Sequence, residues 1–408
     1  MKIALTCNGP GEFSGWFRPL LRALYDADPA LDATVFFVPD DYATGREADV
    51  AREIFPQLRV FGPREYLRFA FGGNLAEAPR SVDLVQYLGG DLMHAARIHG
   101  RLGGRARSYK FWSRSYRRMF ERVYAVDSAN EASLRAQGVA DARIEAVGNL
   151  VVDGVLGEVA GRFGTHDDAA TPEGGVLVLP GNRRHEIASL VPYFLQMAVH
   201  LQRLEPNLPI AFGLSPFTTK AELERALATG GHRLFWGARG TVVEEDGRLW
   251  LTPMGGAARI PVVRDAMRQA GRAKLVVTIP GTKCIELAAL GVPTIVCTPL
   301  NVPELAVVNG PFQYIDRLPV VGVALKRAAV VAVNNRFRFT AQPNIDAGEM
   351  LMPELRGTLT PGRIARAAAA YAQDDAARQA DAPRLRALYA AHAGAATRMA
   401  HSLLEHSC

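Results

Sequence analysis

The stretch KIALTCNGPGEFSGW, residues 2–16, is the part of the sequence that decides the fold class. It begins with a β-type run, Ile3–Cys7, which passes directly into a turn containing Gly9, Gly11 and Gly15 and then into a helical pattern. A strand that ends in a glycine-rich turn before a helix is typical of open α/β sheets, which bind their ligands at such turns. The stretch therefore predicts an α/β protein with a ligand site beside its first strand.

The same alternation of strand and helix patterns continues along the chain in two series. The first series of predicted strands comprises Ile3–Cys7, Thr34–Val38, Leu58–Phe61, Leu84–Tyr87, Val123–Val126 and Ile144–Val147. The second series comprises Val176–Leu179, Ile210–Gly213, Arg233–Trp236, Leu249–Thr252, Leu275–Thr278 and Thr294–Cys297. Strands that alternate with helices form right-handed βαβ units and a parallel sheet, so each series predicts one Rossmann-like domain.

The boundary between the two domains is predicted between Gly154 and Gly175, where glycine, aspartate, threonine and proline accumulate. A length of 408 residues also suits two domains better than one. We therefore expect an N-terminal domain at 1–160 and a second domain at 174–358.

The remaining residues, 359–408, are rich in alanine and arginine and are expected to be helical. Thr360-Pro361 suits the N-cap and the first position of a helix, and Pro383 is expected to break the segment into two helices. These helices are predicted to pack back on the first domain.

Composition indicates a globular protein with an anionic partner. Hydrophobic residues make up 49% and charged residues 22% of the chain, which is enough apolar material for two cores. A net charge of +6 favours phosphate groups, nucleic acid or an acidic membrane face, without choosing among them. No signal sequence or membrane-spanning run is recognisable, so we expect a cytoplasmic protein that contacts a membrane only from one side. Cys7, Cys284, Cys297 and Cys408 lack metal-binding spacing, so free thiols and no metal are expected.

The turn after the first strand offers polar groups at the predicted ligand site. Its glycines permit close approach of the backbone, and Glu12 and Ser14 can face a ligand. The spacing is not the G-x-G-x-x-G fingerprint, so NAD or FAD is not indicated. A turn that only closes a βα unit is the alternative interpretation.

A second turn of this kind, Pro180–Glu186, follows the predicted strand Val176–Leu179. Backbone N–H groups at the start of the next helix, together with the guanidinium of Arg183, would bind a pyrophosphate. The alternative is a solvated, charged first helical turn made by Arg183, Arg184 and Glu186.

A third turn, Pro280–Glu286, follows the predicted strand Leu275–Thr278. Gly281 and Thr282 would offer an N–H and a hydroxyl to a phosphate, and Glu286 could reach ribose hydroxyls from one helical turn further on. Read as structure only, Thr282 would be an N-cap and Glu286 an exposed helix residue.

One segment mixes basic and aromatic residues on a helix-forming sequence, between Arg101 and Arg122. Such a mixture suits a membrane interface, where cations attract lipid phosphates and rings lie at headgroup depth. The expected membrane contacts are Arg107, Lys110, Trp112, Arg114, Arg117 and Arg118. A core-facing aromatic helix with a solvated basic face is one alternative, and nucleic-acid binding is another. No nucleic-acid motif is recognisable, so no nucleic acid is expected as a partner.

Taken together, the three turns resemble those of the lipid-A-disaccharide synthase family, which are glycosyltransferases of GT-B fold. The family pattern Gly-Glu-x-Ser-Gly-Asp matches at Gly11, Glu12, Ser14 and Gly15, with Trp16 in place of the aspartate. The pattern Pro-Gly-Ser-Arg-x-x-Glu matches at Pro180, Gly181, Arg183 and Glu186, with Asn182 in place of the serine.

Two further patterns of this family match, one after Pro180–Glu186 and one before it. Ser-Gly-Thr-x-x-x-Glu matches at Gly281, Thr282 and, allowing for spacing, Glu286, with Pro280 in place of the serine. Gly-His-x-x-x-Asp resembles Gly148, Asn149 and Asp153, with asparagine in place of the histidine. Pro353-Glu354-Leu355 is also similar to the family, so the matches extend from Gly11 to Leu355 and cover most of the chain.

The resemblance implies two Rossmann-like domains with a deep cleft between them, and an inverting hexosyltransferase without cofactor or metal. It implies transfer of a GlcNAc-type sugar from a UDP-sugar to a lipid-linked acceptor at the inner face of the cytoplasmic membrane. A homo-oligomer is compatible with this resemblance. The donor-binding residues would be Gly181, Asn182, Arg183, Gly281, Thr282, Lys283 and Glu286 in the second domain. The acceptor-binding residues would be Gly11, Ser14, Gly15, His94 and Asn149 in the first.

The general base of such a transferase is sought after a strand of the first domain, where Asp91 follows Gly89-Gly90. Asp91 is our first choice and Glu12 the second, although an aspartate after two glycines is also typical of a helix N-cap. The alternatives are another GT-B enzyme, such as a peptidoglycan-lipid GlcNAc transferase or a UDP-GlcNAc epimerase, which would need further acid/base groups and no acceptor. A non-catalytic nucleotide-sugar or glycolipid-binding protein is the alternative of a different class.

Overall fold

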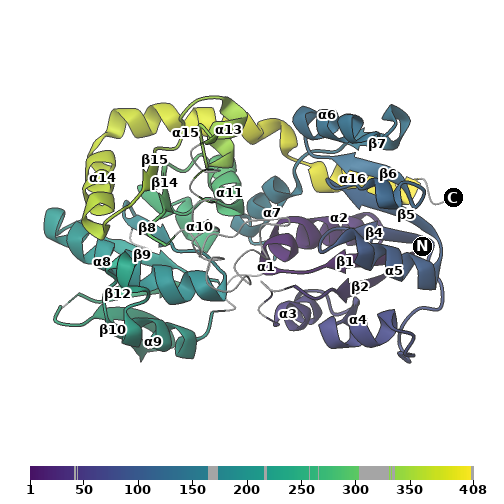
Figure 1. Ribbon diagram of the computed structural model, residues 1–408, viewed down its shortest axis with the longest axis horizontal. Coiled ribbons are helices and arrows are strands. Elements are labelled where there is room, and N and C mark those ends of the chain that lie inside the picture. Colours follow the sequence, from purple (N-terminus) through teal and green to yellow (C-terminus); the bar gives the residue numbers. More distant parts are fainter. Residues whose placement is uncertain are drawn as a thin grey trace. The chain divides into compact units, whose positions relative to one another are not determined.

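A computed structural model describes residues 1–405 apart from 41, 42, 44, 164–172, 216, 217, 257, 265, 303–329, 331 and 333–335. The chain divides into two compact units (Figure 1). Unit 1 comprises Met1–Gly164 and Ala390–Cys408, and unit 2 comprises Thr165–Tyr389. Much of the predicted linker, together with Cys408, lies outside the described residues.

Unit 1 contains a seven-stranded parallel sheet of order β3-β2-β1-β4-β5-β6-β7. Its strands are β1 (Lys2–Cys7), β2 (Asp32–Phe37), β3 (Arg59–Phe61), β4 (Leu84–Tyr87), β5 (Arg105–Tyr109), β6 (Phe120–Ala125) and β7 (Ile144–Ala146). All six predicted strands of this half are confirmed, and β5 is an addition. The strand order reverses between β1 and β4, and open α/β sheets bind ligands at the carboxyl ends of the two strands that flank such a reversal.

The helices of unit 1 cover both faces of this sheet (Figure 1). They are α1 (Pro10–Glu12), a π-helix at Phe13–Phe17, α2 (Arg18–Ala27), α3 (Glu47–Ile54), α4 (Pro63–Ala70), α5 (Leu92–Leu102), α6 (Ser128–Gln137), α7 (Leu150–Val159) and α16 (Ala395–Glu405). The ring of Phe36 on β2 stacks on Phe61 and on Phe69 of α4, with centroids 5.2 and 4.9 Å apart. This aromatic cluster fixes α4 against the sheet, and with it the buried Tyr66.

Unit 2 contains an eight-stranded sheet of order β10-β11-β12-β9-β8-β13-β14-β15. Its strands are β8 (Val176–Leu179), β9 (Ile210–Gly213), β10 (Gly240–Glu245), β11 (Arg248–Pro253), β12 (Ile260–Val263), β13 (Leu275–Thr278), β14 (Thr294–Pro299) and β15 (Glu354–Gly357). The pairs β10–β11 and β11–β12 are antiparallel, and the remaining neighbours are parallel.

One predicted strand of this half, Arg233–Trp236, is wrong. Residues Arg233–Phe235 form a 3-10 turn, because the His232 side chain accepts a hydrogen bond from the Leu234 N–H at 3.2 Å and caps the turn. Trp236 follows in the left-handed region with φ 51°. A local side-chain cap therefore outweighs the β propensity of this apolar run.

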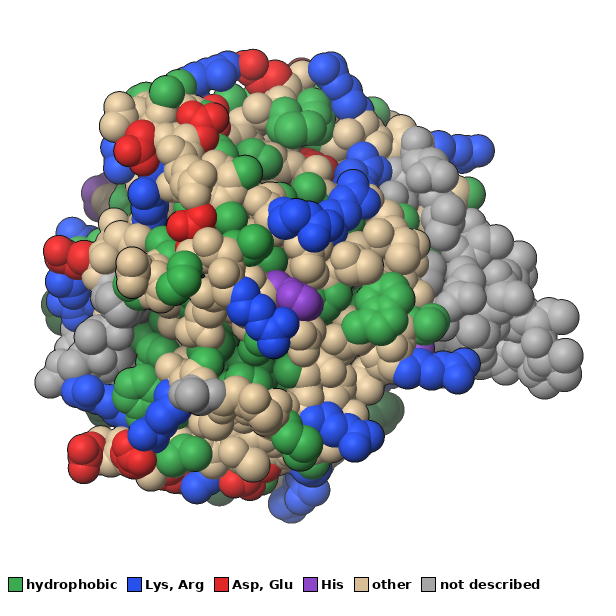
Figure 2. Space-filling view, turned by 90° about the vertical axis from the view of Figure 1, so that its left-hand side faces the viewer, with side chains coloured by type: hydrophobic (Ala, Val, Ile, Leu, Met, Phe, Trp, Pro, Cys, Tyr) green, Lys and Arg blue, Asp and Glu red, His purple; other side chains and the backbone are tan. Residues whose placement is uncertain are grey.

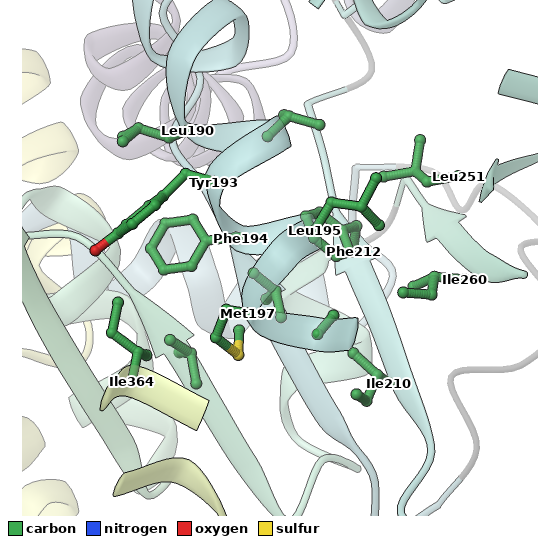
Figure 3. Packing of buried hydrophobic residues seen from close by; sticks show 14 of the residues in the cluster. Leu190, Tyr193, Phe194, Leu195, Met197, Ile210, Phe212, Leu251, Ile260 and Ile364 are labelled. Carbon is green, nitrogen blue, oxygen red and sulfur yellow. The ribbon is translucent and has the colours of Figure 1, made fainter. Parts of the chain in front are cut away.

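The helices of unit 2 are α8 (Arg184–Leu204), α9 (Lys220–Thr229), α10 (Ala266–Ala270), α11 (Thr282–Leu290), α13 (Gln342–Ala347), α14 (Pro361–Gln373) and α15 (Asp375–Tyr389). Figure 3 shows the core around α8, where Tyr193, Phe194 and Met197 lie among Phe212 of β9 and Ile364 of α14. Helix α8 buries side chains around most of its circumference, as expected of a helix enclosed by a sheet and a second helix.

The end of the chain forms three helices rather than two. Thr360 caps α14 as predicted, since its side chain accepts a hydrogen bond from the Arg363 N–H at 3.2 Å. The chain turns at Asp374, between α14 and α15, and α15 continues through Pro383, so the predicted break at this proline is wrong. Helices α14 and α15 belong to unit 2, whereas α16 packs against α2 in unit 1.

On the face that Figure 2 shows, lysine and arginine side chains are spread over the surface, and acidic side chains lie mostly toward the upper left and the lower left of the view. The net positive charge therefore does not gather into one continuous patch on this face. No described helix is both long and apolar enough to cross a membrane. Within the described ranges, no group of three or more His, Cys, Asp and Glu side chains could hold a metal ion. Cys7, Cys284 and Cys297 are buried free thiols.

Candidate functional site

The turn after β4 lies beside the turn after β1 in unit 1, at the reversal of strand order. Gly89 packs against Asn8 and Glu12 so closely that an added Cβ would overlap Asn8 Oδ1 and lie 3.2 Å from Glu12 Cγ. Gly90 has φ +83° and touches Val38, so both glycines are required by sterics. The backbone of this turn is therefore held against the side chain of Glu12.

Glu12 ends α1, and its carboxylate lies close to two buried groups. Burial is the main cause that raises the pKa of Cys7 and of Tyr87, and the Glu12 charge raises both further. Tyr87 donates its hydroxyl to the Gly90 carbonyl at 2.6 Å, so the tyrosine that the Glu12 charge affects is itself bound to the Gly89–Gly90 turn. Glu12 is thus a half-buried acid at the expected ligand edge of the sheet.

The predicted glycine-rich loop around Glu12 is in fact helical, because Pro10 starts a helix that continues through the π-helix into α2. Gly11 is exposed, and an added Cβ there would meet nothing within 4 Å. Gly15 is buried against Val151 of α7, and the Ser14 carbonyl touches Gly154. Gly15 and Ser14 therefore serve the packing of two helices.

Asp91 is the N-cap of α5, where its Oδ1 accepts a hydrogen bond from the Met93 N–H at 2.7 Å. The residue is exposed, and its charge raises the pKa of both Tyr87 and His94 as a smaller contribution than burial. One oxygen of the Asp91 carboxylate thus caps α5, and the negative charge of this carboxylate lies beside the Gly89–Gly90 turn.

His94 lies one helical turn after Asp91. Its Nδ1 is 2.7 Å from the hydroxyl of Tyr66 on α4, and the two rings meet edge to face. Its Cδ2 would lie 3.6 Å from a Cβ on Gly90, so the opposite ring edge faces the glycine turn. Burial lowers the pKa of His94, with Asp91 acting in the opposite direction.

Asn149, another residue expected to bind an acceptor, instead caps a helix. It is buried as the N-cap of α7, where its Oδ1 accepts from the Val151 N–H at 3.1 Å. The carboxylate of Asp153 accepts the N–H groups of Gly394 and Ala396 at 2.7 and 2.6 Å. This sequence motif anchors α16 to α7.

In unit 2, the predicted pyrophosphate site at the start of α8 is occupied by the protein itself. Glu186 Oε2 accepts the N–H groups of Asn182 and Arg183 at 2.9 and 3.0 Å, and Glu186 Oε1 lies 3.5 Å from Arg183 Nη1. Gly181, with φ +107°, leaves room for this carboxylate, because an added Cβ would overlap it. An anion can use these backbone donors only if Glu186 moves.

The start of α11, by contrast, has no side-chain cap. Gly281 is the N-cap residue in a conformation, φ 158° and ψ −170°, that is accessible essentially to glycine alone. Gly281 and Thr282 are both exposed, so the first N–H groups of α11 and the positive end of its dipole are accessible. Glu286 is buried rather than exposed, and accepts a hydrogen bond from Lys283 Nζ at 2.6 Å.

A pocket of about 290 Å³ lies at the carboxyl ends of β13 and β14 within unit 2. Its polar wall comes from the first turn of α8, with Arg183, His185 and Glu186, and its apolar wall includes Ile279 and Pro280. Ligand pockets in proteins measure roughly 300–1,000 Å³, so this one is close to the lower end of that range. The pocket is thus lined both by Arg183 and by Ile279 and Pro280, which directly precede the start of α11.

The segment expected to lie at a membrane interface is not a helix, since it contains β5 and β6 with a 3-10 turn, Arg114–Tyr116, between them. Arg107 is buried and donates to Glu121 Oε1 at 2.8 Å and to the Ser402 carbonyl at 2.9 Å. Trp112 is buried in the core as well. These two residues are therefore excluded as membrane contacts.

The other four predicted membrane contacts differ in their exposure. Arg114, Arg117 and Arg118 are exposed, whereas Lys110 is half-buried with its Nζ 5.8 Å from the centroid of the Trp16 ring. The strand β5 itself was missed because its arginine-rich sequence indicates a solvated segment, although Arg107 is neutralised and buried by its partners.

Neither a protein-family model nor a curated protein matches this chain. Solved structures do match it over its whole length. A putative UDP-N-acetylglucosamine 2-epimerase from Listeria monocytogenes has a TM-score of 0.56 at 14% identity, over 99% of this chain and 96% of that one. The S. aureus MnaA–UDP structure has a TM-score of 0.59 at 12% identity, again over 99% and 96% of the two chains. A UDP-GlcNAc 2-epimerase from Neisseria meningitidis, bound to UDP-GlcNAc, has 0.51 at 11%, over 99% and 100%.

The chain has a GT-B-type fold of two Rossmann-like units. Two of these three structures are described as UDP-GlcNAc 2-epimerases and none as a glycosyltransferase, which corrects the resemblance to lipid-A-disaccharide synthase and the hexosyltransferase activity that it implied. The reason is that the matched motifs are βα turns, which any chain of this fold needs in order to close its units and present helix starts. They identify the fold rather than the reaction.

Sequence reasoning missed Tyr66, which belongs to no motif and meets His94 only through the packing of α4 against the sheet. The capping of the α8 N-terminus by Glu186 could have been predicted from the sequence, because a glutamate at the third helical position is half of a capping box.

Proposed function

We propose that this chain is an isomerase that binds a UDP-linked N-acetylhexosamine and inverts the configuration at C2 of the sugar. The observation that carries the proposal is the pair of carboxylates, Glu12 and Asp91, that lies beside the Gly89–Gly90 turn at the ligand edge of unit 1. The matched structures support it, because two of those described above are UDP-GlcNAc 2-epimerases and two hold UDP or UDP-GlcNAc.

Unit 2 would bind the UDP part of the substrate. The uncapped start of α11 offers backbone donors and a positive dipole end to a diphosphate, and Arg183 adds a guanidinium at the adjoining pocket. The buried carboxylate of Glu286, held by Lys283, is an acceptor for ribose hydroxyls. Since the start of α8 is closed by Glu186, α11 is the better anion site of the two.

Unit 1 would supply the proton transfers. Inversion at C2 requires one group that removes the C2 proton and another that returns a proton on the opposite face. No carbonyl adjoins C2, so its proton leaves only as UDP departs from C1: the C2–H and C1–O bonds break and a C1=C2 double bond forms. Both bonds form again when a proton and UDP add back. Two carboxyl groups can share this task when one is ionised and the other protonated. Glu12 is half-buried and Asp91 is exposed, so the two acids lie in different environments at the same edge of the sheet.

The test is incubation with UDP-GlcNAc alone, without a lipid or another acceptor, followed by proton NMR of the nucleotide sugar. We expect a second UDP-N-acetylhexosamine, epimeric at C2, to accumulate toward equilibrium, and no change in UDP-glucose, which lacks the acetamido group. Unchanged UDP-GlcNAc with full UDP binding would refute the isomerase proposal and leave a nucleotide-sugar-binding protein.

We also propose that unit 1 contacts an anionic membrane, through a different surface from the one that the sequence indicated. The α4–α5 surface comprises Arg64, Leu67, Arg68, Phe71, Met93, Arg97 and Arg101, all of them exposed. Phe71 is 75% exposed, and Arg97 lies 5.3 Å from the centroid of its ring, which joins the two helices into one surface. Exposed rings and aliphatic side chains among arginines suit lipid headgroups.

This proposal predicts sedimentation with vesicles that contain anionic lipid, weakening as salt is raised, and no sedimentation with neutral vesicles. Phe71→Asp should abolish it. Met254→Asp is the matched control, since Met254 is also 75% exposed but lies in unit 2. Equal effects of the two changes, or binding to neither kind of vesicle, would exclude the α4–α5 surface.

A further inference from the structure

The pair formed by Tyr66 and His94 is not used by the proton transfers described above, although it lies at the same edge of unit 1. Tyr66 is buried on α4, 28 positions before His94 in the sequence, and their hydrogen bond joins Tyr66 Oη to His94 Nδ1 at 2.7 Å. Two helices that are separate in sequence are thus joined by this bond beside the Gly89–Gly90 turn. Such a placement suits a group that acts on a ligand.

In this hydrogen bond the hydroxyl of Tyr66 is the donor and His94 Nδ1 is the acceptor, for the following reason. A phenol has one O–H to donate, and leaving that donor unsatisfied in a buried position costs about 1–3 kcal/mol. Among the residues that the structure describes, His94 Nδ1 is the partner of the Tyr66 hydroxyl. Burial also raises the pKa of Tyr66 to about 12, so the hydroxyl keeps its proton near neutral pH.

The tautomer and the charge of the His94 imidazole follow from the direction of this hydrogen bond. If Tyr66 donates to Nδ1, this nitrogen carries no proton, and the proton of neutral His94 must lie on Nε2. Burial lowers the pKa of His94 most, the charge of Arg97 lowers it as well, and the charge of Asp91 raises it without reversing the direction. A neutral imidazole is therefore the form present near neutral pH.

His94 Nε2 makes no hydrogen bond to any residue that the structure describes, and it is bonded to Cδ2, the ring atom nearest the Gly89–Gly90 turn. Cδ2 would lie 3.6 Å from a Cβ on Gly90, a position that the side chain of Val38 fills. Resting on the proposed function, we propose that Tyr66 is a positioning residue that fixes the Nε2–H tautomer of His94, so that His94 donates a hydrogen bond to an oxygen of the sugar. The acceptor would be a hydroxyl or the acetamido carbonyl of the hexosamine.

The tautomer itself is tested without any ligand, by nitrogen-15 NMR of histidine-labelled protein near neutral pH, with His94→Gln identifying the signal. We expect wild type to show an Nε2–H imidazole for His94, and Tyr66→Phe to shift it toward a mixture with the Nδ1–H form. An Nδ1–H form in wild type, or no change in the variant, would overturn the assignment. This result holds whether or not UDP-GlcNAc is turned over.

The contact with the sugar is tested by a double-mutant cycle on UDP-GlcNAc affinity, with UDP as the reference ligand. Tyr66→Phe should weaken UDP-GlcNAc binding about threefold to tenfold, the worth of one hydrogen bond, and leave UDP binding unchanged. Glutamine at position 94 keeps a donor where Nε2 was but has no tautomers. In the His94→Gln background, Tyr66→Phe should therefore have no further effect. Additive losses, equal losses for UDP, or no loss in either background would refute the contact.

Discussion

Replacement of Glu12 by glutamine is expected to lower turnover of UDP-GlcNAc about 10²–10⁴-fold, the usual worth of a general acid or base, with little change in UDP affinity. Glutamine keeps the size of the side chain that packs against Gly89, and it removes only the ability to exchange a proton. The measurement is the initial rate of epimer formation by NMR, together with UDP binding by calorimetry. A rate within a factor of about three of wild type would exclude Glu12 from proton transfer.

Asp91 is the second carboxylate to replace, because one substitution can remove its charge and keep its N-cap hydrogen bond. Asparagine is as good an N-cap as aspartate, so Asp91→Asn should keep the bond to the Met93 N–H and the melting temperature. We expect turnover to fall as far as in Glu12→Gln. Retained activity in Asp91→Asn would show that Asp91 only caps α5. A loss of activity that follows a loss of stability would point to the same structural role.

Replacement of Arg183 by alanine is expected to weaken UDP binding by about 10- to 100-fold, since charge-assisted hydrogen bonds contribute about 1.5–3 kcal/mol each. Arg183 lines the unit 2 pocket, and its Nη1 lies 3.5 Å from Glu186 Oε1, a carboxylate that competes with the diphosphate for it. Calorimetric titration with UDP measures the effect, and added salt should weaken wild-type binding more than binding to the variant.

The neighbouring arginine serves as the control for this prediction. Arg184 is highly exposed, lies 3.4 Å from Glu222 and does not line the pocket, so Arg184→Ala removes the same charge from the same helical turn. We expect no measurable change in UDP affinity. Equal losses in the two variants would mean that UDP responds to the general charge of α8 rather than to a contact with Arg183.

The sequence predicts the central strands well, because buried parallel strands carry continuous apolar runs such as Val176–Leu179 and Leu275–Thr278. The strands β10, β12 and β15 of the second sheet have no predicted counterpart. The strand β5 was missed for the opposite reason, since burial of Arg107 depends on partners from β6 and α16. Pro383 was read as a break, although helices tolerate a proline when tertiary packing holds the flanking turns.

The candidate site was predictable only where local sequence determines it. Glu12 and Asp91 follow strands directly, so their place at the ligand edge could be expected. The contact between Tyr66 and His94 depends on how α4 packs, and no spacing in the sequence reports it. The reaction was the least predictable feature, because the turns that suggested a transferase are shared by enzymes of this fold with different chemistry.

Exchange at C2 of the sugar tests the central claim most directly. In deuterated water, removal of the C2 proton and its return from an acid in contact with solvent must place deuterium at C2. The account predicts that the H2 signal of the nucleotide sugar disappears in wild type, and that an epimer carrying deuterium at C2 accumulates. An intact H2 signal after long incubation, in protein that binds UDP normally, would contradict it.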